Sequence, residues 1–188
     1  METERVLVTQ PAISTQTDLL SIPSSPNPPT ITQPFQIEIA ALGKESYSDS
    51  ISVAALSSIA AYTSLYKHAE LHSLSATIHP TNSAPSNPTA VALAWVPYNS
   101  AASPTQILSV YGGMMFCIGG SIQTLKPIEV LCDLSKVNPI LKSNVTFSDT
   151  PKLLIQSVAP DPPSKLPTCS ITIKGMIRLH SPLLQASA

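Results

Sequence analysis

The chain of 188 residues is 43% hydrophobic and 11% charged, contains 19 prolines and has a net charge of −1. Disordered chains have low hydrophobic content and many charges, so ordinary hydrophobic content with few charges excludes that class. The near-neutral net charge excludes a global basic field that would attract nucleic acid or an anionic membrane. The opening METERVLVTQ is charged where a signal peptide is apolar, and no window has about 18 continuous apolar residues, so we expect neither a secretion signal nor a membrane span.

The first 33 residues differ from the rest of the chain. Residues 21–34, SIPSSPNPPTITQP, are rich in serine and proline and lack a sustained period. This composition predicts an extended, mobile N-terminal arm over residues 1–33. The arm carries three acidic residues and one basic residue, so it is not a basic nucleic-acid tail. Residues 34–188 are expected to form one domain, long enough for a sizeable core.

Strand-like alternation begins at residue 34. Apolar and polar residues alternate over 34–43, and a second short strand is expected within 48–56. Residues 56–66, LSSIAAYTSLY, are the best helical candidate. In residues 68–80, the apolar positions before and after Ser73 share one face only if the register slips by one residue, which predicts a β-bulge there.

Four further strands are expected before the last one. Residues 89–97, TAVALAWVP, are apolar on both faces, which predicts a central strand covered on both sides. Residues 114–118, MMFCI, lie between two glycine pairs and are expected to be a buried strand. The other two strands are expected at residues 128–134 and 151–159.

The last strand, CSITIKGMIRLH at residues 169–180, alternates almost without error. Its apolar side needs a core, whereas its other side carries Lys174, Arg178 and His180. About eight strands joined by turns rich in proline, asparagine and serine, with no long amphipathic helix, predict an all-β fold. The expected architecture is an eight-stranded antiparallel jelly-roll sandwich.

No Asp, Glu, Lys or Arg occurs between Glu70 and Lys126, a stretch of 55 residues. A soluble monomer needs charged residues on its surface. One interpretation is a core-heavy stretch with neutral polar loops. The favoured interpretation is that much of this surface is buried between subunits, because the cores of interfaces are depleted in charge.

His68, Glu70 and His72 are spaced at i, i+2 and i+4, on one face of an extended chain. These side chains are possible metal ligands. No further His or Cys is near them in the sequence, so a polar sheet face is the favoured interpretation. Such a face would titrate near neutral pH and could contact nucleic acid.

No motif of an enzyme is found. GGMMFCIGG has neither the Lys-Ser/Thr of a phosphate-binding loop nor GxGxxG spacing, and no GxSxG occurs. Cys117, Cys132 and Cys169 each fall in an expected strand and are interpreted as buried small hydrophobes. They form no close pair, which favours a reducing compartment. Trp95 is expected in the core, among its apolar neighbours.

Several blocks, in their order, resemble the coat proteins of tymoviruses. The resemblance covers roughly residues 30–185. The blocks are TQPFQ (32–36), YKHAELHSL (66–74), TIHPT (77–81), AWVPYNS (94–100), YGGMMFCIGGSIQTL (111–125), DTPKLL (149–154) and LHSPL (179–183).

The resemblance implies a jelly-roll subunit of a T=3-type icosahedral shell around positive-sense single-stranded RNA. It implies three quasi-equivalent environments for one sequence, and a shell held mainly by protein–protein contacts that can form without RNA. Polyamines and divalent cations would neutralise most of the RNA charge. The protein would be found in the virion, and in the host cytoplasm during assembly.

The resemblance also implies which face meets RNA. In such capsids, the sheet that contains the last strand lies toward the particle interior, and its companions would be the first strand, the strand around 68–79 and the strand at 128–134. The RNA-facing side chains would be His68, Glu70, Lys174, Arg178 and His180. The two histidines match interior histidines of the family, whereas Lys174 and Arg178 rest on the alternation alone. A face of His and Glu predicts tighter RNA retention at mildly acid pH.

Two other function classes remain open at this point. A lectin-like or receptor-binding jelly roll, acting as a monomer or small oligomer, would need an exposed aromatic residue and acidic or amide ligands in its loops. The loops offer Asn82, Asn87 and Asn99 without an acidic partner. A jelly-roll enzyme with a metal at His68 and His72 would need a third ligand.

Overall fold

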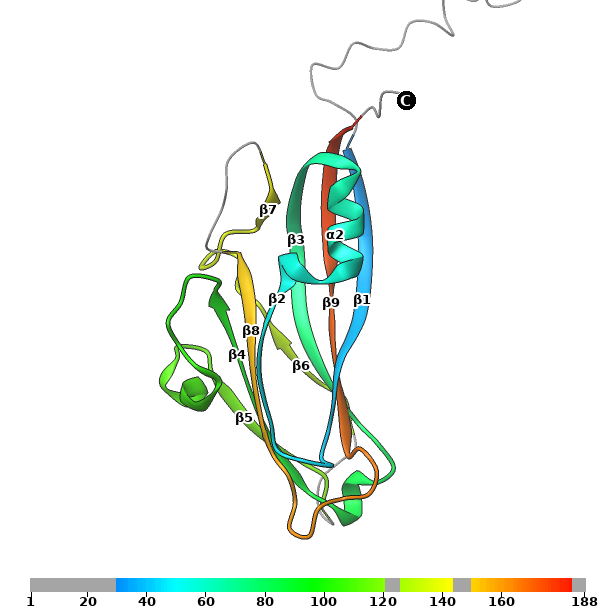
Figure 1. Ribbon diagram of the computed structural model, residues 1–188, viewed down its shortest axis with the longest axis vertical. Coiled ribbons are helices and arrows are strands. Elements are labelled where there is room, and N and C mark those ends of the chain that lie inside the picture. The colour runs from blue at the N-terminus through cyan, green and yellow to red at the C-terminus, as the bar shows by residue number, and fades with distance from the viewer. Residues whose placement is uncertain (1–29, 121–125, 144–149, 184–188) are drawn as a thin grey trace, which may run out of the picture.

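The computed structural model describes residues 30–120, 126–143 and 150–183 (Figure 1). Nine strands, one α-helix and three short 3₁₀ helices lie in these ranges. The strands are β1 (Thr30–Leu42), β2 (Tyr47–Ser52), β3 (Tyr66–Pro80), β4 (Thr89–Pro97), β5 (Met114–Ile118), β6 (Ile128–Leu131), β7 (Ile140–Lys142), β8 (Pro151–Val158) and β9 (Cys169–Pro182). The helices are α2 (Ser57–Ser64), η1 (Val53–Ala55), η2 (Ala84–Ser86) and η3 (Pro104–Ser109).

The strands form two antiparallel sheets that face each other. The β9 sheet has the order β1-β9-β3-β6, and the short β7 also pairs with β3. The β8 sheet has the order β2-β8-β4-β5. The predicted jelly-roll sandwich is confirmed, and so are the three predicted companions of the last strand. The additional strand β7 is three residues long, too short to show a period in the sequence.

The core lies between the sheets, where the apolar side of each strand points inward. Ile171, Ile173 and Ile177 of β9 are fully buried and belong to the same cluster as Leu153 and Ile155 of β8. These residues alternate along their strands because successive side chains point to opposite faces. Trp95 packs against the same cluster, as predicted, and its indole N–H donates to the carbonyl oxygen of Val130 in the other sheet at 3.2 Å.

A second apolar cluster covers the outer face of β4. Ala92, Ala94 and Val96 point away from the main core and pack with Leu154 of β8 and Ile107 of η3. The prediction that β4 is covered on both faces is therefore confirmed. The cover is η3 and its flanking loop, not another sheet.

Two local predictions for residues 56–80 are also confirmed. The helix forms at Ser57–Ser64 and buries Ile59 against the core. The register of β3 against β9 shifts between Leu71 and Ser73, which is a bulge at the predicted place. His72 is the extra residue and has no partner on β9.

Strand β5 differs from its prediction. It has the predicted bounds, but it is an edge strand and most of its side chains are exposed. Cys117 is therefore exposed, and the expectation that it is buried was wrong. Cys132 and Cys169 are buried, which raises the pKa of their thiols to about 12 and about 11.

The first strand includes the last residues of the predicted arm. Strand β1 begins at Thr30, so residues 30–33 pair with β9. The rest of the predicted arm, residues 1–29, lies outside the described residues. No helix in the described ranges is long and apolar enough to cross a bilayer.

Candidate nucleic-acid interface

The antiparallel register of β3 and β9 brings the predicted site residues onto one face. His68 lies opposite His180, and Glu70 lies opposite Arg178. Lys174 is farther along β9, opposite Ser75. These positions alternate with buried residues of β9, so their side chains point away from the core. The five residues share the outward face of the β9 sheet.

The two histidines stack on one another. Their ring centroids are 4.6 Å apart and their planes differ by 15°. The pKa of His68 is lowered, first by desolvation and then by the nearby His180 and Lys67. A proton on His68 is therefore disfavoured in the folded chain.

Lys174 is already paired within the chain. Its ammonium lies 3.0 Å from a carboxylate oxygen of Glu129 in β6, and the same oxygen accepts a hydrogen bond from the hydroxyl of Ser75 at 2.8 Å. The hydrogen bond from Ser75, and then the one from Lys174, lower the pKa of Glu129. Glu129 was not predicted as a site residue, although its alternation with the buried Val130 places it on this face.

Arg178 differs from Lys174. Its side chain is exposed, and it forms no ion pair with any other described residue. Glu70 faces it in register but is not ion-paired with it. The guanidinium is therefore free to bind a phosphate in the forked geometry that arginine favours.

All four histidines of the chain lie on β3 or β9. His79, which was not predicted as a site residue, forms a hydrogen bond of 2.9 Å between its ring nitrogen and the hydroxyl of Thr172. His72 is exposed in the bulge. In the described ranges, no three His, Cys, Asp or Glu side chains are arranged to hold a metal ion.

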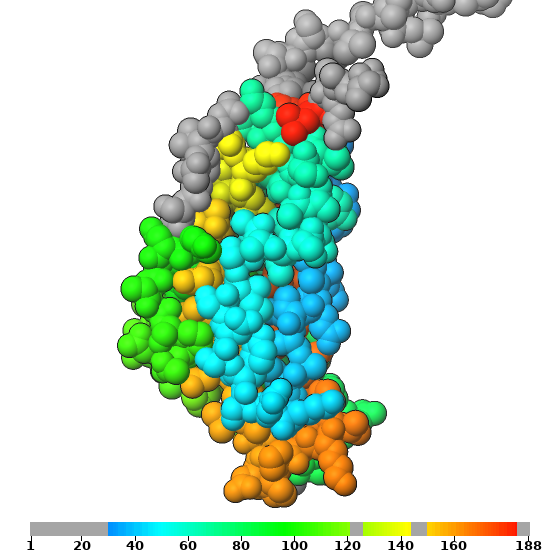
Figure 2. Space-filling view, in the orientation of Figure 1, coloured from blue at the N-terminus to red at the C-terminus, as the bar shows by residue number. Residues whose placement is uncertain are grey.

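A second surface stands out at the opposite sheet. Exposed apolar side chains lie directly after β4, in η3, in β5 and in the loop before β5, all within the uncharged segment. We call these residues the lateral apolar surface: Tyr98, Leu108, Tyr111, Met114 and Met115. Figure 2 shows η3 and its neighbours in green, at one side of the molecule. The ammonium of Lys136 lies 4.4 Å from the ring centroid of Tyr111, and that of Lys152 lies 5.9 Å from the ring centroid of Tyr98.

Comparison with known proteins identifies the family. The family model described as "Tymovirus coat protein" matches residues 20–188. The capsid protein of Kennedya yellow mosaic virus is 58% identical, and the match covers 100% of both chains. The solved structure of Desmodium yellow mottle tymovirus superposes with a TM-score of 0.84 at 50% identity and full coverage of both chains. The empty head of turnip yellow mosaic virus gives a TM-score of 0.84 at 40% identity, covering 100% of this chain and 94% of that one. The chain therefore belongs to the tymovirus coat protein family, and it is a structural, non-enzymatic component of a virion.

Proposed function

We propose that the chain assembles with copies of itself into a closed T=3-type icosahedral shell around positive-sense single-stranded RNA. Protein–protein contacts hold the shell, and the β9 sheet faces its interior. The observation that carries this proposal is the lateral apolar surface within the uncharged segment. The solved relative described as an empty head supports a shell that needs no RNA.

The lateral apolar surface is unusual for a monomer. Tyr111 is 84% exposed and Leu108 is 61% exposed. Large exposed apolar residues concentrated in one part of the chain are typical of sites of protein association, and aromatic residues and Met are enriched in interfaces whereas charges are depleted. The same residues lie in a stretch of 55 positions without Asp, Glu, Lys or Arg, which matches an interface and not a solvated surface.

The contacts with RNA are weak in this proposal. The positive charges of Lys174 and Arg178 are balanced by the negative charges of Glu70 and Glu129, so the net charge of these four side chains is zero. Only the histidines can add positive charge to the predicted site. Such a face cannot neutralise the phosphates of a long RNA, so polyamines and divalent cations must accompany the RNA into the shell. Three free cysteines suit assembly in the reducing host cytoplasm.

One substitution tests the role of the lateral apolar surface. Leu108→Lys should abolish or sharply reduce shell formation without unfolding the subunit, because the side chain is exposed in the subunit and its charge would be desolvated in an interface. Leu108→Met, which keeps an apolar side chain of similar volume, is the control and should still assemble. Analytical sedimentation separates shells from subunits, and circular dichroism checks the fold. Full assembly of Leu108→Lys would exclude this surface as a contact.

A further inference from the structure

Helix α2 carries no charge on the side that is open to water. Residues 50–66, which include the whole helix, contain no Asp, Glu, Lys or Arg. The exposed residues on one side of α2, spaced at i, i+3, i+4 and i+7, are Ser57, Ala60, Ala61 and Ser64. The outer face of a helix in a soluble protein usually carries charged residues. This face of α2 therefore suits contact with protein better than contact with water.

Two exposed leucines extend the uncharged face beyond the end of the helix. Leu65 is 55% exposed and Leu183 is 47% exposed. The backbone N–H of Leu183 donates to the carbonyl oxygen of Leu65 at 2.9 Å, so the two residues are adjacent although they are far apart in the sequence. Figure 1 shows α2 at the end of the sandwich where β9 ends. We call these two leucines and the four exposed helix residues the α2 surface.

The hydroxyl groups in the last turn of α2 already have hydrogen-bond acceptors within the helix. The hydroxyl of Ser64 donates to the carbonyl oxygen of Ala61 at 2.7 Å, and that of Thr63 donates to the carbonyl oxygen of Ala60 at 3.2 Å. A polar group that keeps its hydrogen bond costs little free energy to bury. Another protein could therefore cover this turn without leaving these donors unpaired.

A closed shell of identical chains needs a surface that binds its own copy. Contacts around a ring join two different patches of the chain, whereas a contact across a two-fold axis joins one patch to the same patch. A residue near such an axis faces its own counterpart, so a charged residue there would face a like charge, which is strongly unfavourable. A surface without charges at its centre avoids this repulsion.

We propose that the α2 surface is the place where two copies of the chain meet across a two-fold axis of the shell. The two helices are antiparallel, so Leu65 of one copy lies against the first turn of α2 in the other copy, and the reverse contact is the same. The small side chains of Ala60 and Ala61 let the helix axes approach to about 8–10 Å, as in packed helices generally. The inference deepens the proposed function and rests on it.

The lateral apolar surface is less suited to this position. The ammonium groups of Lys136 and Lys152 lie near its two tyrosine rings. A two-fold axis close to these rings would bring the lysines of both copies toward one another, which like charges oppose. The lateral apolar surface is therefore assigned to a contact with a different patch of the neighbouring copy.

An exchange of charge at Ala61 tests the two-fold contact in the full chain. Ala61→Glu and Ala61→Lys each add a charge at an exposed position, and both new residues are good helix formers, so the subunit should fold. Each variant alone should form about ten-fold fewer shells in analytical sedimentation, or fewer still, because like charges meet across the axis. An equal mixture of the two variants should regain shells, because opposite charges then meet. Five copies around a ring cannot alternate in charge, so recovery in the mixture is specific to a two-fold contact.

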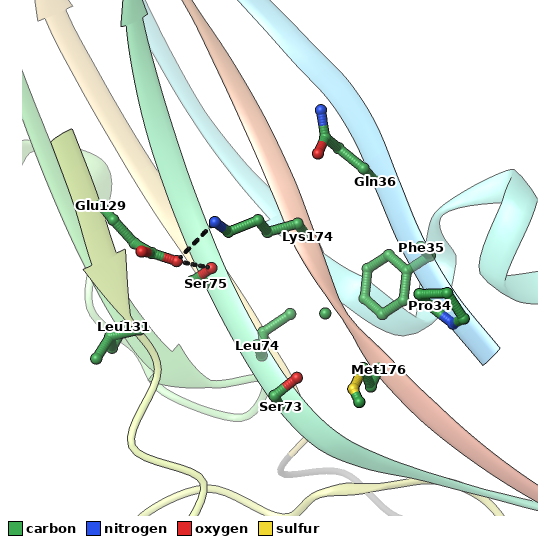
Figure 3. A pocket seen from close by; sticks show the side chains of 11 residues that line it. Pro34, Phe35, Gln36, Ser73, Leu74, Ser75, Glu129, Leu131, Lys174 and Met176 are labelled. Carbon is green, nitrogen blue, oxygen red and sulfur yellow. Dashed lines mark hydrogen bonds and ion pairs between the residues drawn. The ribbon is translucent and has the colours of Figure 1, made fainter. Parts of the chain in front are cut away.

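Ser73 provides the matched control. It is a small, exposed residue of β3, opposite Met176, and it lines the outward face of the β9 sheet (Figure 3). In the proposed function this face looks into the particle and not toward another copy. Ser73→Glu and Ser73→Lys should therefore each form shells on their own. Circular dichroism checks that every variant is folded, and the same exchange at Ala60 replaces any Ala61 variant that is not.

The outcomes separate this inference from the proposed function. If either folded Ala61 variant forms shells on its own as the wild-type chain does, the α2 surface is free in the shell, and the inference is overturned while the proposed function stands. If neither variant forms shells alone and their mixture does not either, α2 meets a different patch, which also overturns the two-fold contact. If the wild-type chain forms no shells with or without RNA, the proposed function fails and the inference fails with it.

Discussion

At the scale of single residues, His68, whose ring stacks on that of His180, is the member of the predicted site with a shifted pKa. The lowered pKa of His68 means that the folded chain disfavours its proton. The stability contributed by the unprotonated stack is therefore fully present above the ordinary histidine pKa of about 6.5. It is lost as the pH falls through the lowered pKa. A phosphate of RNA near His68 would raise its pKa, because a nearby anion favours the protonated imidazole.

Empty and RNA-filled shells should therefore differ in their response to acid. Between pH of about 8 and 5, where His ordinarily titrates, the melting temperature of empty shells should fall, and the fraction of RNA released by filled shells should also fall. His68→Asn should weaken both trends, whereas His72→Asn, in the bulge, is the control and should not. RNA release is measured by absorbance after sedimentation of the shells. Release that is flat across this range would rule out the histidine pair as the RNA contact.

At the scale of strands and helices, patterns within one strand were predictable and contacts between strands were less so. The alternation of apolar and polar residues predicted the approximate bounds and the inward faces of β9 and β3. A one-residue slip in that alternation predicted the bulge in β3. The charge partner of Lys174 was missed because Glu129 is distant in sequence and joins it only through the pairing of β6 with β3. Burial of Cys117 was wrongly expected, since a five-residue apolar run does not say whether a strand is central or at an edge.

The cover over β4 leads to a prediction about stability. Leu154→Ala should lower the free energy of unfolding by about 2–5 kcal/mol, because the side chain is fully buried in the second cluster and its removal leaves a cavity. Leu131→Ala, the same change at a residue that is 74% exposed, should cost less than about 0.5 kcal/mol. Urea unfolding of the unassembled subunit measures both. Equal losses would contradict the burial of the outer face of β4 in the subunit.

At the scale of the whole molecule, composition and motifs predicted association and family, which the local patterns of single strands did not. Few charges and an uncharged segment pointed to a surface that other copies cover. The order of the sequence blocks pointed to the family, and the non-basic arm agreed with it. The family and the jelly roll are confirmed by the comparisons. The orientation of the sheet toward RNA and the shell geometry belong to the assembly, so one chain cannot show them, and they stay predictions.

Contacts between copies of this chain should be sufficient to build the shell without RNA. The most direct test is analytical sedimentation of the full chain expressed alone, with negative-stain imaging of the fast fraction. Closed, RNA-free shells are the predicted result. A monomer or small oligomer that forms shells only after RNA and polyamine are added would contradict the claim, because the RNA would then supply a necessary part of the stabilisation.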